Sequence, residues 1–549
     1  MRRAIIMGLV VSVALTGCVG IPTSGGVETG PIIDEQLDPD FVIDPSGPRA
    51  GSSQEEILAD FMLAVRGPQG NYEIAREFLT TDFATKWDPD ASTTIRTGIP
   101  ATTPGVAANS LDYTITSKAY VDADGRYFEP GSATQVLTFS FTQEKGEWRI
   151  SAAPDGIVLS QSSFSVVFTE RALYFFDPTY TYLVPDVRWF ASRSTLPLWV
   201  IRELLGGPAA WLQQGVVLSA FPLSTTLQTA AIDSGVATVE LSTEALTASA
   251  VDRDRMRQQL AATLDVANVV MTVGGIEITA PATGPQATKD PTVEGSALIA
   301  TDADFGFDTG EGVVPLEGIS STVVAAGATA ATLSNDQQYV AMLAAGGVFV
   351  VERGSDLGDP VDARPGLAAP SIDPFRFVWS AQAASAATLS TFEIDGTEHP
   401  LAGVPPADAA VVSLDVSRDG ARLLLYLSTP LGPRLAVAGI IRDQKNIPTA
   451  LGALEYLPVA GNSPIDAAWV DNRTVATVSQ GTEVAPVTLY EIGGPSATFG
   501  QVPDASTIVG GNGGADGLRV LRATGEVLRP QGSSWVSTGL SARLLATKQ

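Results

Sequence analysis

A short polar turn recurs through the last third of the chain and constrains the fold more than any other feature of the sequence. Ser334 and Ser417 introduce the segments that contain YVAMLAAGGVFVV and ARLLLYLS, whose apolar residues are spaced as in partly or fully buried strands. Asp373 and Asp471 stand in the same place before FRFVWS and RTVATVS. Each repeat thus consists of a strand, a turn similar to Ser-x-Asp-Gly, a buried strand and an outer strand. In these turns the Asp caps the tight bend, and Gly420 supplies a positive φ.

The spacing of the turns predicts an all-β C-terminal β-propeller over residues 313–549. Ser334 and Ser417 lie 83 positions apart, which corresponds to two repeats of about forty residues, the length of one four-stranded blade. The region has room for five or six blades, and the final segment LSARLLATKQ could close the ring against the first blade. A β-sandwich is the alternative fold, but it would not require a repeated turn.

Residues 286–312 are rich in Thr, Pro, Gly and Asp and predict a linker before the propeller. Asp302, Asp304 and Asp308 lie within it and could suggest a calcium site. Their spacing lacks the turn glycine and the terminal Glu of an EF-hand loop. We therefore expect a solvated acidic linker and no metal site.

The middle of the chain predicts a compact α/β domain over residues 170–285. Two buried strands in RALYFFDPTYTYLVPDVRWF are joined by a turn at Asp177-Pro178, and a helix from Leu198 ends at Gly206-Gly207-Pro208. Strand and helix alternate in the remainder, with a strand at 236–241, a helix at 252–264 and a closing strand pair at 269–278.

The segments LWVIRELLGGP and VVLSAFP, together with the strand pair before them, resemble the GerMN domain of bacterial envelope and sporulation-germination proteins. Arg188 and Trp189 could mark a binding face of this domain, but they fit the edge of its core equally well. We assign them no role.

The first folded region, residues 51–165, predicts an α+β domain. Ser53 and Glu56 form a plausible capping box before Ile57, Phe61 and Val65, which share one helical face. A second helix, capped by Asn71, should carry Ile74, Phe78 and Phe83. Alternating apolar residues then predict antiparallel strands, as at Tyr113 and Ile115, at Leu137, Phe139 and Phe141, and at Trp148 and Ile150. Helices followed by a curved sheet resemble the cone-shaped NTF2 family, whose cones often hold a pocket. We expect the aromatic residues here to form core.

The N-terminus has the pattern of an exported lipoprotein. Arg2 and Arg3 precede an apolar run from Ala4 to Leu15 that is too short to span a bilayer. The following Leu15-Thr16-Gly17-Cys18 resembles the bacterial lipobox, which implies that residues 1–17 are a signal peptide and that Cys18 is lipidated, for example with palmitate. An ordinary secretory signal with a chance cysteine is the alternative.

Residues 18–50 are rich in Gly, Pro, Ser and Thr and predict a flexible tether. The expected location is the extracytoplasmic face of the cell membrane, held there by the lipid. Several acyl chains on one cysteine would be a sufficient anchor.

The residue counts exclude most catalytic and metal chemistry. Cys18 is the only cysteine and His399 the only histidine, so cysteine-ligated metals, histidine clusters and a Ser-His-Asp triad lack their parts. We expect His399 to be an exposed loop residue. The glycine run 510–514 has no Walker lysine and is expected to be an inter-strand loop. We predict no catalytic residue, cofactor or metal, and hence no enzyme; an envelope hydrolase is the least favoured alternative.

The negative net charge of the chain excludes nucleic acid as a binding partner. The chain has 33 basic and 60 acidic residues and a net charge of −27, and it would repel phosphate backbones. The acidic surface favours solubility, or steering toward basic patches on a protein partner.

The order of lipobox, tether, α+β domain, GerMN-like domain and propeller resembles the actinobacterial LpqB lipoprotein family across nearly the whole chain. This resemblance implies a non-enzymatic accessory of the MtrAB two-component system. It would contact the extracytoplasmic domain of the sensor histidine kinase MtrB and influence envelope homeostasis and division. The alternative is a receptor for an envelope ligand such as a glycan or peptide, bound in the cone or the mouth of the propeller.

Overall fold

The computed structural model describes residues 45–281, 284–459, 461–512 and 514–549. The predicted signal peptide, Cys18 and nearly all of the predicted tether lie outside these residues. No helix within the described ranges is both long and apolar enough to cross a membrane.

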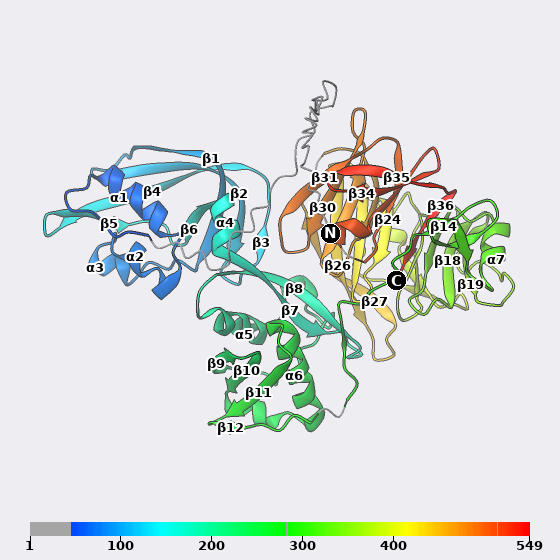
Figure 1. The fold of residues 1–549 in the computed structure, drawn as a ribbon, viewed down its shortest axis with the longest axis horizontal. Helices are drawn as coiled ribbons and strands as arrows, with labels where there is room; N and C mark the ends of the chain where they lie inside the picture. Colours follow the sequence, from blue (N-terminus) through cyan, green and yellow to red (C-terminus); the bar gives the residue numbers. More distant parts are fainter. Residues whose placement is uncertain (1–44, 282–283, 460, 513) are drawn as a thin grey trace, which may run out of the picture. The chain divides into compact units, whose positions relative to one another are not determined.

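The first domain packs short helices on a mostly antiparallel sheet (Figure 1). The capping box is confirmed, because the Ser53 hydroxyl accepts from the Glu56 amide at 3.2 Å and the Ser53 amide donates to Glu56 Oε2 at 2.9 Å. The sheet order is β5-β4-β2-β1-β6, with β3 paired to β2. The elements are α1 (Gln54–Ala64), α2 (Glu73–Arg76), α3 (Thr81–Ala84), β1 (Ser92–Pro104), β2 (Ser110–Asp122), β3 (Tyr127–Phe128), β4 (Ala133–Glu144), β5 (Glu147–Ala152) and β6 (Ile157–Ser160).

The predicted second helix is wrong as a continuous element, because it is divided into α2 and α3. Between them, Ile150 of β5 pairs through its backbone with Phe78 and Thr80, at 2.9 and 2.8 Å. The Thr80 hydroxyl then starts α3 by accepting from the Phe83 amide. The cap of α2 is Tyr72 and not Asn71. A backbone pairing with a distant strand therefore overrides the helical spacing of the side chains.

The middle domain contains two sheets and two long helices. The Asp177 turn between its first two strands is confirmed, since the Asp177 carboxylate accepts from the amides of Thr179, Thr181 and Tyr182. One sheet has the order β13-β8-β7 and the other β12-β11-β10-β9. The elements are α4 (Gln161–Val167), β7 (Phe168–Phe176), β8 (Tyr182–Ala191), α5 (Leu196–Gly206), β9 (Leu227–Asp233), β10 (Val236–Leu241), α6 (Ala250–Leu264), β11 (Asn268–Val273), β12 (Ile276–Glu277) and β13 (Thr288–Lys289).

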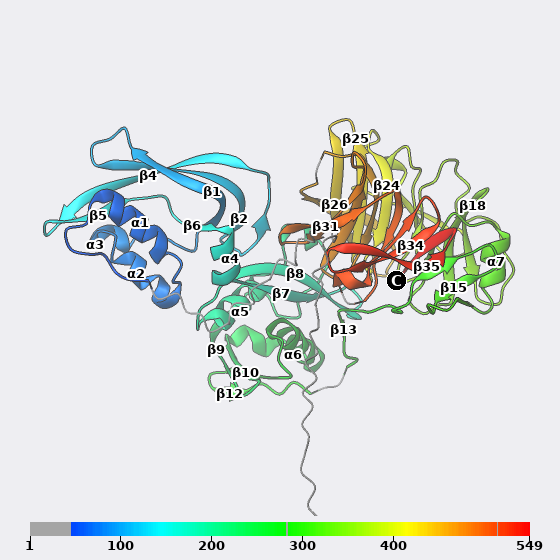
Figure 2. The same ribbon diagram turned by 45° about the horizontal axis from the view of Figure 1, so that its top comes forward.

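The C-terminal region is the predicted β-propeller (Figure 1, Figure 2). Strand β36 pairs antiparallel with β14 and parallel with β17, so the last strand joins the first blade and closes the ring. The described residues form six blades, which are β36-β14-β15-β16, β17-β18-β19, β20-β21-β22-β23, β24-β25-β26-β27, β28-β29-β30-β31 and β32-β33-β34-β35. Strands β17, β20, β24, β28, β32 and β36 contact one another in a closed order.

The strands of the propeller are short, and their bounds are as follows: β14 (Leu298–Ala300), β15 (Phe305–Asp308), β16 (Val313–Pro315), β17 (Ala330–Leu333), β18 (Tyr339–Ala344), β19 (Gly347–Glu352), β20 (Ser371–Ile372), β21 (Val378–Ser380), β22 (Ser390–Phe392), β23 (Glu398–Pro400), β24 (Ala410–Val416), β25 (Arg422–Thr429), β26 (Gly432–Arg442), β27 (Pro448–Leu457), β28 (Pro464–Trp469), β29 (Thr474–Ser479), β30 (Ala485–Glu491), β31 (Ser496–Val502), β32 (Ala505–Val509), β33 (Arg519–Arg522), β34 (Glu526–Gln531), β35 (Ser534–Ser541) and β36 (Leu544–Lys548). The short helix α7 (Ser320–Ala325) precedes β17.

The first propeller blade corrects the prediction of a linker over residues 286–312. Strands β14 and β15 lie inside this segment, and Asp304 is in the turn between them, where its carbonyl accepts from the Thr301 amide at 2.8 Å. Leu298 and Phe305 are completely buried. The acidic residues of this segment are explained by the turn of the hairpin, whereas its few apolar residues are buried in the core.

The middle domain and the propeller share one hydrophobic core within a single compact unit. Val216 and Trp211 of the middle domain lie against β26 and β27. Gly439 of β26 is essential to this contact, because a Cβ atom there would stand 2.5 Å from Val216 Cγ2 and 2.9 Å from the Trp211 carbonyl oxygen.

Gly439→Ala should therefore destabilise the packing of the middle domain on the propeller by about 1–3 kcal/mol, the usual effect of overpacking. The unfolding midpoint in urea and the rate of limited proteolysis measure this effect. Gly358→Ala is the matched control, because a Cβ at Gly358 meets nothing within 4 Å. Equal sensitivity of the two variants would contradict the proposed role of Gly439.

Candidate functional site

The repeated turns of the propeller are structural, as the sequence indicates. The carboxylate of Asp336 accepts from the Gln338 amide at 3.1 Å, and that of Asp419 accepts from the Ala421 amide at 3.0 Å. Asp471 accepts from the amides of Arg473 and Thr474 at 2.9 and 2.8 Å. Each Asp therefore satisfies backbone donors of the turn that joins the first two strands of its blade.

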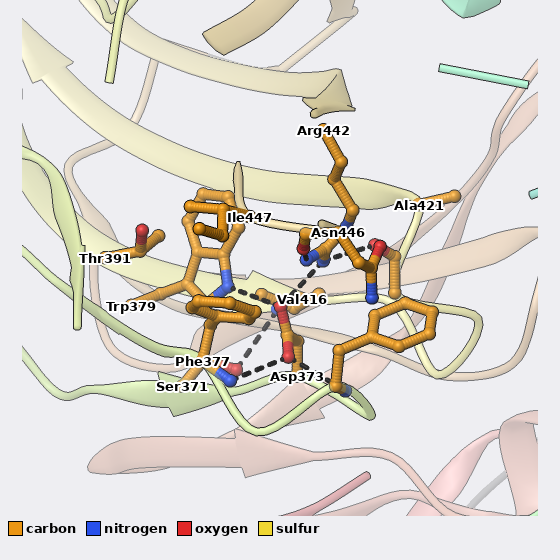
Figure 3. A network of polar contacts seen from close by, with 12 residues as sticks. Ser371, Asp373, Phe377, Trp379, Thr391, Val416, Ala421, Arg442, Asn446 and Ile447 are labelled. Atoms are coloured by element: carbon orange, nitrogen blue, oxygen red, sulfur yellow. Dashed lines mark hydrogen bonds and ion pairs between the residues drawn. The ribbon is translucent and has the colours of Figure 1, made fainter. Parts of the chain in front are cut away.

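Asp373 extends its turn into a network between neighbouring blades (Figure 3). Its Oδ1 accepts from the amides of Phe375 and Phe377, both at 2.9 Å. Its Oδ2 accepts from Trp379 Nε1 at 3.1 Å and from Arg442 Nη2 at 2.6 Å. Arg442 comes from β26 of the next blade, and its guanidinium lies 4.6 Å from the centre of the Phe375 ring. Because the side chains of this ion pair are at most 1% exposed, the pair connects two blades and leaves no charge for a ligand.

Two further buried carboxylates lie on the strands that contact one another around the ring. Asp415 of β24 accepts from Ser371 Oγ and Gln549 Nε2, both at 3.1 Å. Asp466 of β28 accepts from the Ile508 amide at 2.9 Å. Burial raises the pKa of Asp415 and of Asp466 to about 7, against the hydrogen bonds that favour the ionised forms. These contacts hold strands of different blades together.

Among the described residues, the side chain of His399 contacts Glu393 and Phe377. Its Nε2 lies 2.9 Å from Glu393 Oε1, and its ring packs against Phe377 at a centroid distance of 6.0 Å. The expectation of an exposed loop residue needs correction, because His399 lies in β23, opposite Thr391, with 22% of its side chain exposed.

The glycine run lies between β32 and β33, as predicted. Across the described ranges, no three His, Cys, Asp or Glu side chains come together as a metal site.

Arg188 and Trp189 are used in internal contacts between domains. Arg188 is 3% exposed and donates through Nε and Nη2 to Asp186, at 3.1 and 2.7 Å. Its Nη1 donates to the carbonyl of Asp124 in the first domain at 2.8 Å, whereas Trp189 Nε1 donates to the carbonyl of Gly493 in the propeller at 2.9 Å. The described structure thus favours the core-edge interpretation over a free binding face.

Further acidic side chains lie near Arg188, where the first domain, the middle domain and the propeller contact one another. Burial raises the pKa of Glu203 on α5 to about 7; Arg188 and Arg126 oppose this shift, and Asp124 and Asp122 add to it. In an unfolded chain a glutamate titrates near 4.5. The folded state therefore binds more protons between these two pH values, and stability decreases as the pH rises from about 4.5 to 7.

Glu203→Gln should remove this pH dependence. The variant is expected to gain stability relative to the parent chain between pH 5 and pH 8, by about 2 kcal/mol at the upper end. Thermal unfolding midpoints of both proteins across this range measure the effect. Glu483→Gln, in an exposed loop, is the control that should shift little; a parallel pH profile for Glu203→Gln would disprove the assignment.

The first domain, whose resemblance to the NTF2 family implies a pocket, contains a cavity of about 270 Å³. It is lined by α1, β1, β2 and β6, and by two arginines together with Tyr113. No local motif indicates this cavity, because its walls come from segments distant in the sequence.

The fold and its contacts define a class: multi-domain proteins with an α+β N-terminal domain and a C-terminal β-propeller, whose polar networks serve structure. Two family models match the chain, "Lipoprotein LpqB, N-terminal domain" at residues 47–165 and "Lipoprotein LpqB beta-propeller domain" at residues 305–541. The chain belongs to the LpqB lipoprotein family.

Relatives in this family come from several actinobacteria. A Lipoprotein LpqB of Cutibacterium acnes is 32% identical over 303 residues, which are 53% of this chain and 49% of the relative. One from Streptomyces coelicolor is 27% identical over 505 residues, covering 79% of this chain and 78% of the relative. The chain thus spans about half the length of the first relative in this alignment.

Among solved structures, the first GerMN domain of the Bacillus subtilis sporulation protein GerM is similar, with a TM-score of 0.18 and 22% identity. The match covers 22% of this chain and 94% of that domain. The Nidogen/Laminin complex matches with a TM-score of 0.30 and 12% identity, over 44% of this chain and 91% of that one.

Proposed function

We propose that this protein is a lipid-anchored, extracytoplasmic binding scaffold that modulates a sensor histidine kinase of the MtrAB type. Family membership supports the lipoprotein class, and the lipobox at Cys18 supports the anchor and its face. We also assign the first domain to the NTF2 type and the middle domain to the GerMN type, on their sequences.

The observation that carries the scaffold proposal is the shared core of the middle domain and the propeller. A continuous core holds two domains as one body, so that both can present a preformed surface to a partner. Such a surface loses little conformational freedom on binding. The polar side chains of the propeller networks described above form hydrogen bonds within turns and between blades. Because these side chains are used in structural contacts, we infer that the propeller serves binding and not catalysis.

Anchoring adds to this proposal, because it confines the scaffold and a membrane-embedded kinase to one plane. The effective concentration rises without a new contact. Cys18→Ala should therefore leave the fold unchanged, as measured by circular dichroism, and should reduce the effect on kinase output severalfold in cells. Full activity of the freely secreted variant would contradict the role of the anchor.

Photo-crosslinking in intact cells tests the partner. A photoreactive residue at Leu431 on the propeller, 84% exposed, or at Leu223 in the middle domain, 93% exposed, should capture the extracytoplasmic domain of the kinase. Ile99 in the first domain is 97% exposed and serves as the control position. Absence of the kinase from the adducts at both test positions, or equal capture at Ile99, would refute the proposed contact surface.

A receptor for an envelope ligand is the second candidate, and the cavity in the first domain is the observation in its favour. A neutral glycan fits this cavity poorly, because two guanidinium groups and several apolar side chains line it. The cationic and apolar side chains that line the cavity favour a ligand other than a neutral glycan.

A further inference from the structure

The cavity of about 270 Å³ in the first domain has one apolar side and one cationic side. Helix α1 and the residue Val158 of β6 supply most of the apolar wall. The apolar lining residues are Leu58, Ala59, Met62, Leu63, Pro100 and Val158. Leu63 at the end of α1 is 49% exposed, so the apolar surface continues to solvent. This size lies just below the range of about 300–1,000 Å³ that is usual for small-molecule sites.

The cationic side consists of Arg66, which follows α1, and Arg96 on β1. Within the described part of the chain, neither guanidinium has a carboxylate oxygen within 4.0 Å. Among the other arginines nearby, Arg49 is paired with Asp60 and Arg126 with Asp122, whereas Arg76 and Arg149 donate to backbone carbonyls and do not line the cavity. In a chain with 60 acidic and 33 basic residues, Arg66 and Arg96 place two guanidinium groups without a carboxylate partner at the edge of one apolar cavity, an arrangement suited to an anionic ligand.

Local backbone structure places Arg96 at a break in the sheet. The pairing of β1 with β2 shifts register between Ile95 and Arg96, and again between Thr97 and Ala101. Gly98 allows this bulge with a φ of 66°, and its carbonyl accepts from Arg96 Nη1 at 2.5 Å. Bulges of this kind redirect side chains next to functional sites.

Tyr113 adds a phenol to the polar side of the cavity, which also contains the hydroxyls of Thr102 and Ser160. Burial raises the pKa of its phenol, and the nearby charges of Arg96 and Arg66 oppose this shift. The hydroxyl is therefore protonated at neutral pH and can donate a hydrogen bond. The two guanidiniums provide donors only, and the hydroxyl groups can donate as well as accept, so the lining is rich in donors for an anionic headgroup.

We propose that this cavity binds an amphipathic anion, with a phosphate or carboxylate headgroup at Arg66 and Arg96 and an apolar chain along α1. The planar guanidinium of arginine matches both headgroups with charge-assisted hydrogen bonds. The apolar chain would cover Met62 and Val158 and leave toward Leu63. The inference is independent of the contact with a kinase.

Calorimetric titration of the full chain carrying Cys18→Ala, handled without detergent, tests the proposal. Octyl phosphate and octanoate are the two anionic probes, and the tighter of them identifies the headgroup. Octanol and octyltrimethylammonium test the apolar chain alone and the opposite charge. We expect saturable binding of at least one anion below about 1 mM, with much weaker binding of the alcohol and the cation.

Arg66→Met and Arg96→Met should each weaken binding of the anion by about 10- to 100-fold, since each removes a charge-assisted contact. Arg149→Met is the matched control, because Arg149 lies in the same domain, donates to the Trp148 carbonyl and does not line the cavity. Melting curves verify that each variant is folded. The proposal fails if neither anion binds, if octanol binds as tightly as the anions, or if the double variant of Arg66 and Arg96 keeps the affinity of the parent.

Discussion

Arg442→Met is expected to destabilise the propeller by about 3–5 kcal/mol, because it leaves a buried aspartate without its counter-charge. Arg442 Nη2 lies 2.6 Å from Asp373 Oδ2, and it also donates to the Gly420 carbonyl at 2.9 Å. Methionine reproduces the apolar stem of arginine but lacks the guanidinium group, so that the charge and the donors are lost. Urea unfolding of the full chain, followed by the β-sheet signal in circular dichroism, measures this difference.

Arg434→Met is the matched control for this prediction. Arg434 is on the same strand, β26, is exposed and donates only to the neighbouring Pro433 carbonyl at 3.3 Å. Its replacement should change the free energy of unfolding by no more than about 0.5 kcal/mol. If the two variants unfold at the same urea concentration, the contact between Arg442 and Asp373 does not stabilise the ring.

Asp186→Ala should have an effect of similar size, about 3–5 kcal/mol, at the junction of the three domains. The substitution removes the partner of Arg188 Nε and Nη2 and the acceptor of the Ala209 amide, which lies 2.8 Å from Asp186 Oδ2. Arg188 would keep only the Asp124 carbonyl as an acceptor. A buried guanidinium without its carboxylate is unfavourable, and we expect the first and middle domains to separate at lower denaturant concentration.

Asp252→Ala provides the comparison, because Asp252 forms a surface pair with Arg255 and its side chain is 42% exposed. Such pairs contribute at most about 1 kcal/mol. Protease susceptibility between the first two domains, measured together with the unfolding midpoint, separates a local loss at the junction from a general one. Unchanged susceptibility and midpoint in Asp186→Ala would show that the Asp186–Arg188 pair is dispensable.

The features that were predicted correctly depend on contacts between residues close in sequence. The hydroxyl of Ser53 caps a helix through an amide three residues ahead, and the Asp177 carboxylate accepts from amides two, four and five residues ahead. The turns of the propeller have the same property. Because each of these motifs closes within one turn, its residues are sufficient to identify it.

The predictions that failed depended on distant pairing. The helix expected after Asn71 is interrupted by Ile150 of β5, and the expected linker is drawn into the propeller by β36. In both cases, unpaired backbone groups find partners in a strand that lies far away in the sequence. Backbone pairing of this kind outweighs a local spacing of apolar residues.

The candidate sites also differ in whether their residues are close together or far apart in the sequence. Asp186 and Arg188 are two positions apart on a strand and therefore on one face, which is a sequence signal for an ion pair. Arg66, Arg96 and Tyr113 have no such relation, and only the packing of α1 over the sheet brings them to one cavity.

The sequence by itself determined the repeated turns of the propeller, the main elements of the middle domain and the presence of one histidine and one cysteine. These follow from side-chain period, turn chemistry and residue counts, all of which act over a few residues or need no structure. Only the tertiary structure decided the number of blades, the entry of β14 and β15 into the first blade, the use of Arg188 and Trp189 between domains, and the cationic cavity. Each of these arises from burial and pairing between distant segments, whose energies depend on which surfaces meet.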